Sequence, residues 1–251
     1  MFTTQTWHDF VTSMAKNQYY KNEELQKAWI LACQFYNKEY KPMFFKIGNL
    51  KLQKNVVIFD LPSIATCKGA CKACYALKAE RLYKNTRIMR AFHYACFLLA
   101  FESQAKRKFL YNYINDELFF HDNFIKNLVV RLHSSGDFFS KKYLNFWLKI
   151  IKNNNKIKFY TYSKQLDNIK IDDINNKYNN FNIIKSIINI NNNNYINFGN
   201  KEYLLTIKKE LKKAKKDFFV CDYGTKKTNK KTCMGTCKKC LSCPHVLFYQ
   251  H

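Results

Sequence analysis

The sequence predicts an α/β fold, in which a partial (β/α) barrel follows a helical extension and precedes a cysteine-rich metal module. Two observations predict it. Short apolar segments alternate with segments of helical periodicity, as in parallel sheets with crossover helices. Seven of the ten cysteines also fall into two clusters, and an eighth, Cys221, lies shortly before the second. We expect a helical extension at 1–50, the α/β core at 51–220 and a cluster or zinc module at 221–251.

The first 46 residues and three later segments have helical patterns. Near the N-terminus, apolar side chains recur at helical spacing. These side chains are Leu25, Trp29, Ile30, Cys33 and Tyr36. Residues 75–105, the segment that begins at Ser140 and residues 202–216 are the other expected helices. Cys33 has no neighbouring cysteine, so we expect a small core residue.

Three apolar segments have the composition of buried strands. They are Val56–Leu61, which stops at Pro62, Leu128–Leu132 and Ile157–Tyr162. Weaker strand patterns occur at 181–187, 195–198 and 218–220, and the Asn-rich residues 189–194 indicate a loop.

Polar or cysteine residues follow the predicted strands. The first strand leads to the cysteines that start at Cys67, the second to 133–137, the third to 161–164 and the last to Cys221. Because the carboxyl ends of parallel strands meet at one edge, we expect a single site there.

The two cysteine clusters differ in their number of thiols. The first cluster supplies three thiol ligands, from Cys67, Cys71 and Cys74. Three ligands leave one coordination position of a metal or cluster open for chemistry. The second cluster has four thiols, enough for a zinc ion or an iron–sulfur cluster. Its members are Cys233, Cys237, Cys240 and Cys243. Cys221 is either left over or the fourth ligand of the first site.

The C-x3-C-x2-C spacing after a first strand resembles the radical S-adenosylmethionine superfamily. That resemblance implies a 4Fe-4S cluster on the three thiolates, S-adenosylmethionine on the open iron, and an external electron donor. Residues 134–137 resemble the Gly-Gly-Glu motif of that superfamily, which implies that Ser135, Gly136 and Asp137 hold the cofactor. The resemblance also implies that Thr161, in the third strand, makes a further polar contact with the cofactor. The C-terminal cysteines would bind a second cluster, with zinc as the alternative.

A closer resemblance is to the phage family called gene product eighty-eight. It rests on residues 61–67, Cys74-Tyr75-Ala76, residues 131–140 and the cysteine-rich C-terminus. The resemblance implies a phage or mobile-element origin and a metal site, and it supplies no reaction.

Composition and charge limit the location and the partners. A hydrophobic content of 47% excludes a disordered chain. No apolar run has the length of a membrane span and no signal peptide is evident, so we expect no membrane partner. The expected location is the cytoplasm, the host's if the chain is phage-encoded, where clustered cysteines indicate metal ligands. A net charge of +25 suggests nucleic acid, although an AT-rich genome also enriches lysine.

Two residues are candidates for catalysis. Asp137 could hold a cofactor amine or act as base or nucleophile, or it could be an ordinary helix N-terminal carboxylate. His133 is either catalytic or a core residue. Asp60 needs a buried partner, for which Arg131 is the candidate. Arg81, Arg87 and Arg90 could hold phosphate or carboxylate groups, but a solvated helix face is the expectation.

Three functions follow. The first is a radical S-adenosylmethionine-like enzyme that acts on nucleic acid or nucleotides. The second is a guanine transglycosylase-like enzyme with structural zinc, in which Asp137 and Asp60 are the carboxylates. The third is a non-enzymatic, zinc-stabilised nucleic-acid-binding protein, whose binding would depend on salt.

Overall fold

The computed structural model describes residues 4–48, 52, 54–67, 74–166 and 168–185, and two short strands near the C-terminus. The predicted strand at 195–198, the predicted helix at 202–216 and Cys71 lie outside the described residues. So do the four cysteines of the C-terminal cluster. Among the helices that are described, none combines the length and apolar character needed to cross a membrane.

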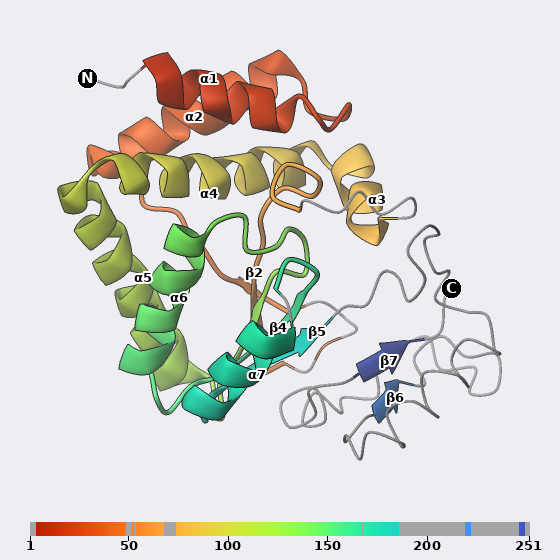
Figure 1. Ribbon diagram of the computed structural model, residues 1–251. Coiled ribbons are helices and arrows are strands. Elements are labelled where there is room, and N and C mark those ends of the chain that lie inside the picture. The colour runs from red at the N-terminus through yellow and green to blue at the C-terminus, as the bar shows by residue number, and fades with distance from the viewer. Residues whose placement is uncertain are drawn as a thin grey trace, which may run out of the picture.

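The architecture is a mixed α/β fold built on a five-stranded sheet (Figure 1). The strands are β1 (Lys46–Ile47), β2 (Val56–Phe59), β3 (Val129–Leu132), β4 (Lys158–Ser163) and β5 (Phe181–Lys185). They lie side by side in chain order, with β1 antiparallel to β2 and all other pairs parallel. The described strands form an open sheet that ends at β1 and β5, so they do not close a barrel. The α/β class is confirmed.

A second, two-stranded parallel sheet pairs β6 (Phe219–Cys221) with β7 (Val246–Phe248). The strand predicted at 218–220 therefore exists, but its described pairing is with β7. The expectation that this strand ends at the edge of the main sheet was wrong in that respect, because it assumed one continuous sheet.

Seven helices are described. They are α1 (Thr4–Met14), α2 (Asn22–Tyr36), α3 (Tyr75–Leu82), α4 (Lys84–Glu102), α5 (Gln104–Phe124), α6 (Lys141–Asn153) and α7 (Asn168–Lys177). Figure 1 shows α1 and α2 stacked over α4, with α5 and α6 beside the sheet. The predicted helix at 75–105 is two helices, because Tyr83 between them has extended backbone angles. Helices α5 and α7 were not predicted from the sequence.

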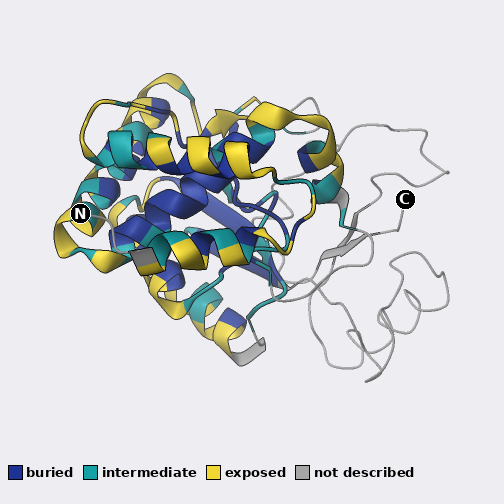
Figure 2. Cartoon of the chain, turned by 90° about the horizontal axis from the view of Figure 1, so that it is seen from above, coloured by how far each residue is buried: buried dark blue, intermediate teal, exposed yellow. Residues whose placement is uncertain are grey.

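The hydrophobic core joins the sheet to its helices. Every residue of β2 is buried, and Phe59 packs against Phe97 of α4 and Trp147 of α6 at ring-centroid distances of 5.9 and 5.1 Å. Helix α4 is buried along most of its length, as the dark stretches of Figure 2 illustrate. Phe10 of α1 and Phe35 of α2 belong to the same core. The N-terminal helices are therefore built into the body that carries the sheet.

Candidate functional site at the carboxyl edge of the sheet

Three loops meet where the parallel strands β2, β3 and β4 end. Phe59 and Leu132, the last residues of β2 and β3, are aligned with each other and with Thr161, and β4 continues to Ser163. The N–H of His133 donates to the carbonyl of Phe59 at 2.8 Å, and the N–H of Leu61 donates to the carbonyl of Ser135 at 3.0 Å. The common edge predicted for these three strands is confirmed.

Gly136 packs the second loop against the start of the cysteine loop. Its φ of +84° lies in the left-handed region, which favours glycine. A Cβ at this position would lie 2.6 Å from the Cβ of Leu61 and 2.7 Å from the Oγ1 of Thr66. Thr66 directly precedes Cys67, so this close approach holds the first cysteine of the trio beside the loop after β3.

Asp60 organises the edge through its buried carboxylate. Its Oδ1 accepts hydrogen bonds from the Oγ of Ser134 at 2.5 Å and the N–H of Ser135 at 2.9 Å. Its Oδ2 pairs with Lys46 at 2.5 Å and Arg90 at 3.4 Å. Burial alone would raise the pKa of Asp60, but the two cations outweigh burial and hold this pKa well below its ordinary value.

Arg131, the partner predicted for Asp60 from the sequence, lies elsewhere. Its guanidinium lies over the ring of Tyr162, 5.4 Å from the centroid. Arg131 belongs to β3, where its side chain points to one face of the sheet, whereas the cations that reach Asp60 come from β1 and α4.

Asp137 is almost completely buried and held by three donors. These are the N–H of Phe138 at 2.7 Å, the Oγ of Ser163 at 2.8 Å and the N–H of Lys164 at 2.7 Å. Burial raises the pKa of Asp137, and the three hydrogen bonds oppose that rise. Because Ser163 and Lys164 lie at the end of β4 and just after it, this carboxylate joins the loops after β3 and β4.

His133 is also buried within the protein. Its Nε2 lies 2.7 Å from the hydroxyl of Tyr143, and its Nδ1 lies 3.5 Å from the Oγ1 of Thr161, which is itself buried. Burial lowers the pKa of His133 to about 3, so the imidazole is neutral at pH 7. In the part of the chain that the structure describes, no hydrogen bond joins His133 to Asp137. These contacts are those of a core histidine.

The residues expected to hold S-adenosylmethionine are largely occupied by protein contacts. The backbone N–H and C=O of Ser135 bond to Asp60 and Leu61, and Gly136 is closely approached by Leu61 and Thr66. The Oγ of Ser135 is buried and has no hydrogen-bond partner among the described residues. The predicted roles of Ser135, Gly136, Asp137 and Thr161 in holding that cofactor stay predictions.

Arg87 and Arg90 are buried, which contradicts the expectation of a solvated helix face. Arg87 makes a two-pronged pair with Glu24 of α2, with nitrogen–oxygen distances of 2.7 and 2.6 Å. Arg90 lies between Asp60 and Glu80 of α3. Arg81 alone of the three is exposed. The reason is that α4 is enclosed on most sides, so its charged residues need internal partners.

Cys67 and Cys74 flank the cysteine loop at this edge. Both are half-buried, and Cys74 directly precedes α3. Within the described ranges, which omit Cys71, no group of three or more potential ligands is arranged around a metal position. The donor chemistry of the trio still fits a soft metal centre, because thiolates are the preferred ligands of iron–sulfur clusters and of zinc.

Two strained backbone positions lie beside these loops. Ile64 and His133 have φ values of 64° and 60°, which are uncommon for residues with a Cβ and unfavourable for β-branched isoleucine. Strain of this kind concentrates at functional sites, where the surrounding contacts enforce it. The loops that lead to Cys67 and to Gly136 both carry such a position.

Comparison with known proteins gives one match. The family model described as Gene product 88 matches residues 21–248, which is most of the chain and includes the described edge and both cysteine clusters. No curated protein and no solved structure matches the chain.

Proposed function

The chain belongs to the Gene product 88 family, and we propose that it is an iron–sulfur protein of the radical S-adenosylmethionine-like type. Cys67, Cys71 and Cys74 would hold a 4Fe-4S cluster beyond the carboxyl edge of the sheet. A cluster with three protein ligands supplies one-electron chemistry at its open iron. An external electron donor would reduce it, and the cytoplasm of the host is the expected setting.

The observation that carries the proposal is the anchoring of the cysteine loop at this edge. Cys67 follows Thr66, which packs on Gly136, and Cys74 precedes α3. Both ends of the loop, Cys67 and Cys74, therefore adjoin the described framework. Parallel strands in chain order, with the loop after the first of them, also agree with a barrel-type site.

The C-terminal cysteines extend the proposal to a second centre. Cys233, Cys237, Cys240 and Cys243 would bind a second cluster or a zinc ion, since four thiolates satisfy either. Cys221 is the last residue of β6, and it would be a further ligand of one of the two centres.

A base-exchange enzyme has less support from the described geometry. Its nucleophile would be Asp137 or Asp60, and both carboxylates are buried and saturated by protein donors. The same burial favours the non-enzymatic candidate, a zinc-stabilised protein that binds nucleic acid through its net charge of +25. That candidate predicts binding that weakens steeply with salt and no turnover.

We expect anaerobically reconstituted protein to cleave S-adenosylmethionine when a reductant is supplied, with release of methionine. The cluster that Cys67, Cys71 and Cys74 would hold would pass one electron from the reductant to S-adenosylmethionine, whose carbon–sulfur bond would break to give methionine and an adenosyl radical. The Cys67→Ser variant should lose this activity, because it removes a ligand of the cluster. The measurement is methionine release per chain over time.

Cys33→Ser is the matched control, since Cys33 is a half-buried cysteine on α2. It should retain the activity of the wild-type protein. A wild-type protein that holds the cluster but releases no methionine under reduction would contradict the radical function and leave the cluster itself standing.

A further inference from the structure

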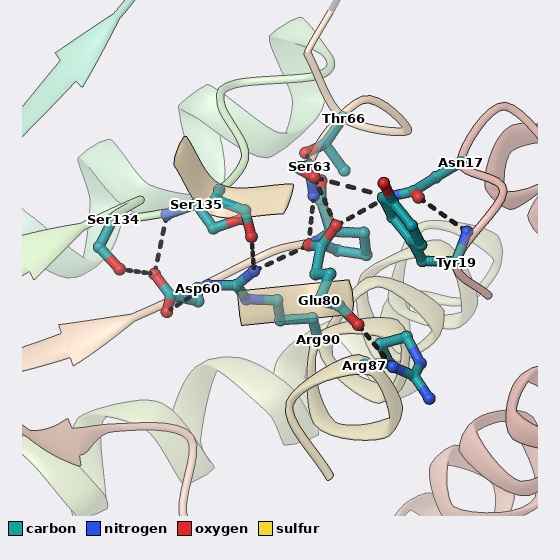
Figure 3. A network of polar contacts seen from close by, with 12 residues as sticks. Asn17, Tyr19, Asp60, Ser63, Thr66, Glu80, Arg87, Arg90, Ser134 and Ser135 are labelled. Atoms are coloured by element: carbon teal, nitrogen blue, oxygen red, sulfur yellow. Dashed lines mark hydrogen bonds and ion pairs between the residues drawn. The ribbon is translucent and has the colours of Figure 1, made fainter. Parts of the chain in front are cut away.

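Glu80 is the centre of a buried polar network beside the cysteine loop (Figure 3). The residue lies on α3 and is fully buried. Its Oε1 accepts from the N–H of Ser63 at 2.9 Å and from the Nη1 of Arg90 at 2.8 Å. Its Oε2 accepts from the Oγ of Ser63 at 2.5 Å and from the Nδ2 of Asn17 at 2.7 Å. One carboxylate therefore collects four donors.

The hydrogen bonds between Ser63 and Glu80 join the two sides of the cysteine loop. Ser63 lies four residues before Cys67, and Glu80 lies six residues after Cys74. The bonds between Ser63 and Glu80 close the chain into a ring that contains all three cysteines. One of them uses the backbone N–H of Ser63, so the main chain itself is fixed at the start of the loop.

Arg90 connects this closure to the sheet. Its guanidinium donates to Glu80, to the carbonyl of Ala76 at 3.3 Å and to Asp60 at 3.4 Å. Asp60 directly follows β2, and Ala76 lies in the first turn of α3. Figure 3 shows Arg90 between the two carboxylates, with Ser134 beyond Asp60 and Ser135 above it. The two ends of the cysteine loop are therefore fixed relative to the strand that precedes it.

Hydrogen bonds that close the loop in this way affect metal binding because they hold the cysteine ligands in place. Charge-assisted hydrogen bonds to a buried carboxylate are strong and directional. A loop whose ends are already fixed loses less conformational freedom when its thiols converge on a metal. Residues that orient ligands in this way affect metal affinity by about 10- to 100-fold when they are replaced.

We propose that Glu80 is the positioning residue for the two ends of the cysteine loop, and that it pre-arranges Cys67 and Cys74 for a soft metal or cluster. The metal-binding half of this inference rests on the proposed function. The fixing of the two ends rests on the described contacts alone. Glu80 acts through Ser63 and Arg90 and touches no reacting atom.

The test compares two glutamates whose carboxylates each accept hydrogen bonds from the main chain of a distant segment. Glu80→Gln removes the charge that closes the loop, whereas Glu117→Gln removes the charge of a glutamate on α5 that accepts from the N–H groups of Phe44 and Phe45 at 2.8 Å each. The first readout is the alkylation rate of Cys67 and Cys74 in metal-free protein, relative to that of Cys33 in the same molecule. The second readout is the Zn²⁺ affinity of the trio, measured as the protection of Cys67 and Cys74 from alkylation when Zn²⁺ is titrated into the metal-free protein.

We expect E80Q to speed alkylation of Cys67 and Cys74 relative to Cys33, and to weaken Zn²⁺ binding by about 10- to 100-fold. E117Q should leave both readouts near the wild-type values. Ser63→Ala, which removes one hydroxyl and keeps the backbone bond, should shift both readouts in the same direction by less. This milder variant keeps the test decisive if E80Q does not fold.

Equal relative alkylation rates in wild type, E117Q and both loop variants would overturn the role of Glu80. A wild-type chain whose cysteine trio takes up no Zn²⁺, and no iron after reconstitution, would instead contradict the proposed function. The alkylation rates would still decide whether Glu80 orders the loop, so the two failures are distinguishable.

Discussion

Replacement of Gly136 by alanine is expected to lower the free energy of unfolding by about 3 kcal/mol or more. The left-handed φ of +84° already disfavours a side chain, and the new Cβ would lie 2.6 Å from Leu61 and 2.7 Å from Thr66. Leu61 cannot withdraw easily, because its own N–H is bound to Ser135 across the same interface. Urea unfolding at pH 7 measures the loss.

Lys141→Ala is a suitable control for this experiment, since Lys141 is an exposed residue of the nearby helix α6. It should change stability by less than about 0.5 kcal/mol. If G136A were as stable as K141A, the close packing of Gly136 against Leu61 and Thr66 would be wrong. A displaced Thr66 should also reduce the metal content, because Cys67 is the next residue.

The Asp60→Asn variant is expected to lose about 3 kcal/mol at pH 7, because removal of one partner from a buried ion pair leaves the other charge poorly compensated. The introduced amide oxygen can still accept the hydrogen bonds from Ser134 and Ser135, but the neutral side chain no longer offsets the charge of buried Arg90. Chemical denaturation of the two proteins measures the difference. Asp172→Asn, at an exposed aspartate of α7, is the matched control and should have almost no effect.

The pH dependence separates the contribution of Asp60 from that of the buried histidines. The pKa of Asp60 is depressed in the folded state, so its stabilisation is present above its ordinary value of 3.8 and is lost as the pH falls below it. Burial lowers the pKa of His93 to about 4 and that of His133 to about 3. Their unfolded forms take up protons near pH 6.5, so both histidines reduce stability as the pH falls from there toward 4.

We therefore expect wild type and D60N to lose stability in parallel between about pH 6.5 and about 4. Below about pH 4 the wild-type protein should continue to lose the part of its stability that Asp60 supplies. The stability curves of wild type and D60N should therefore converge. Curves that stay equally far apart down to about pH 2 would contradict a charged, cation-paired Asp60 in the folded protein.

The strands that build the edge could be predicted from sequence. Val56–Phe59, Val129–Leu132 and Lys158–Ser163 lie within or next to apolar runs of β-forming residues, and polar residues follow each of them. Parallel pairing then places the ends together without further information. The side-chain partners at those ends could not be predicted in the same way, because they depend on helices that are distant in sequence.

Helix α5 was not predicted because its buried face is narrow. Its buried residues are Leu110, Ile114, Leu118 and His121, which form a single stripe. Phe119, Phe120 and Phe124 are exposed and disturb the contrast between an apolar and a polar face. Hydrophobic periodicity is a weak signal for such a helix.

The burial of Arg87 and Arg90 could be predicted from the composition of their helix, although not from the spacing of its apolar residues. Helix α4 is apolar on nearly all sides, and a helix of that kind is buried. Its arginines must then be internal and paired. The choice of Glu24 and Glu80 as their partners depends on tertiary contacts, and Glu24 lies 63 residues from Arg87.

The most direct test of the central claim is the iron, acid-labile sulfide and zinc content of anaerobically purified protein. We expect a brown wild-type protein with roughly four irons for the cysteine trio and roughly eight if the C-terminal cysteines hold a second cluster. Cys71→Ser should lose about four irons, whereas Cys33→Ser should lose none. A colourless protein that holds only zinc after anaerobic reconstitution would contradict the iron–sulfur assignment of the trio.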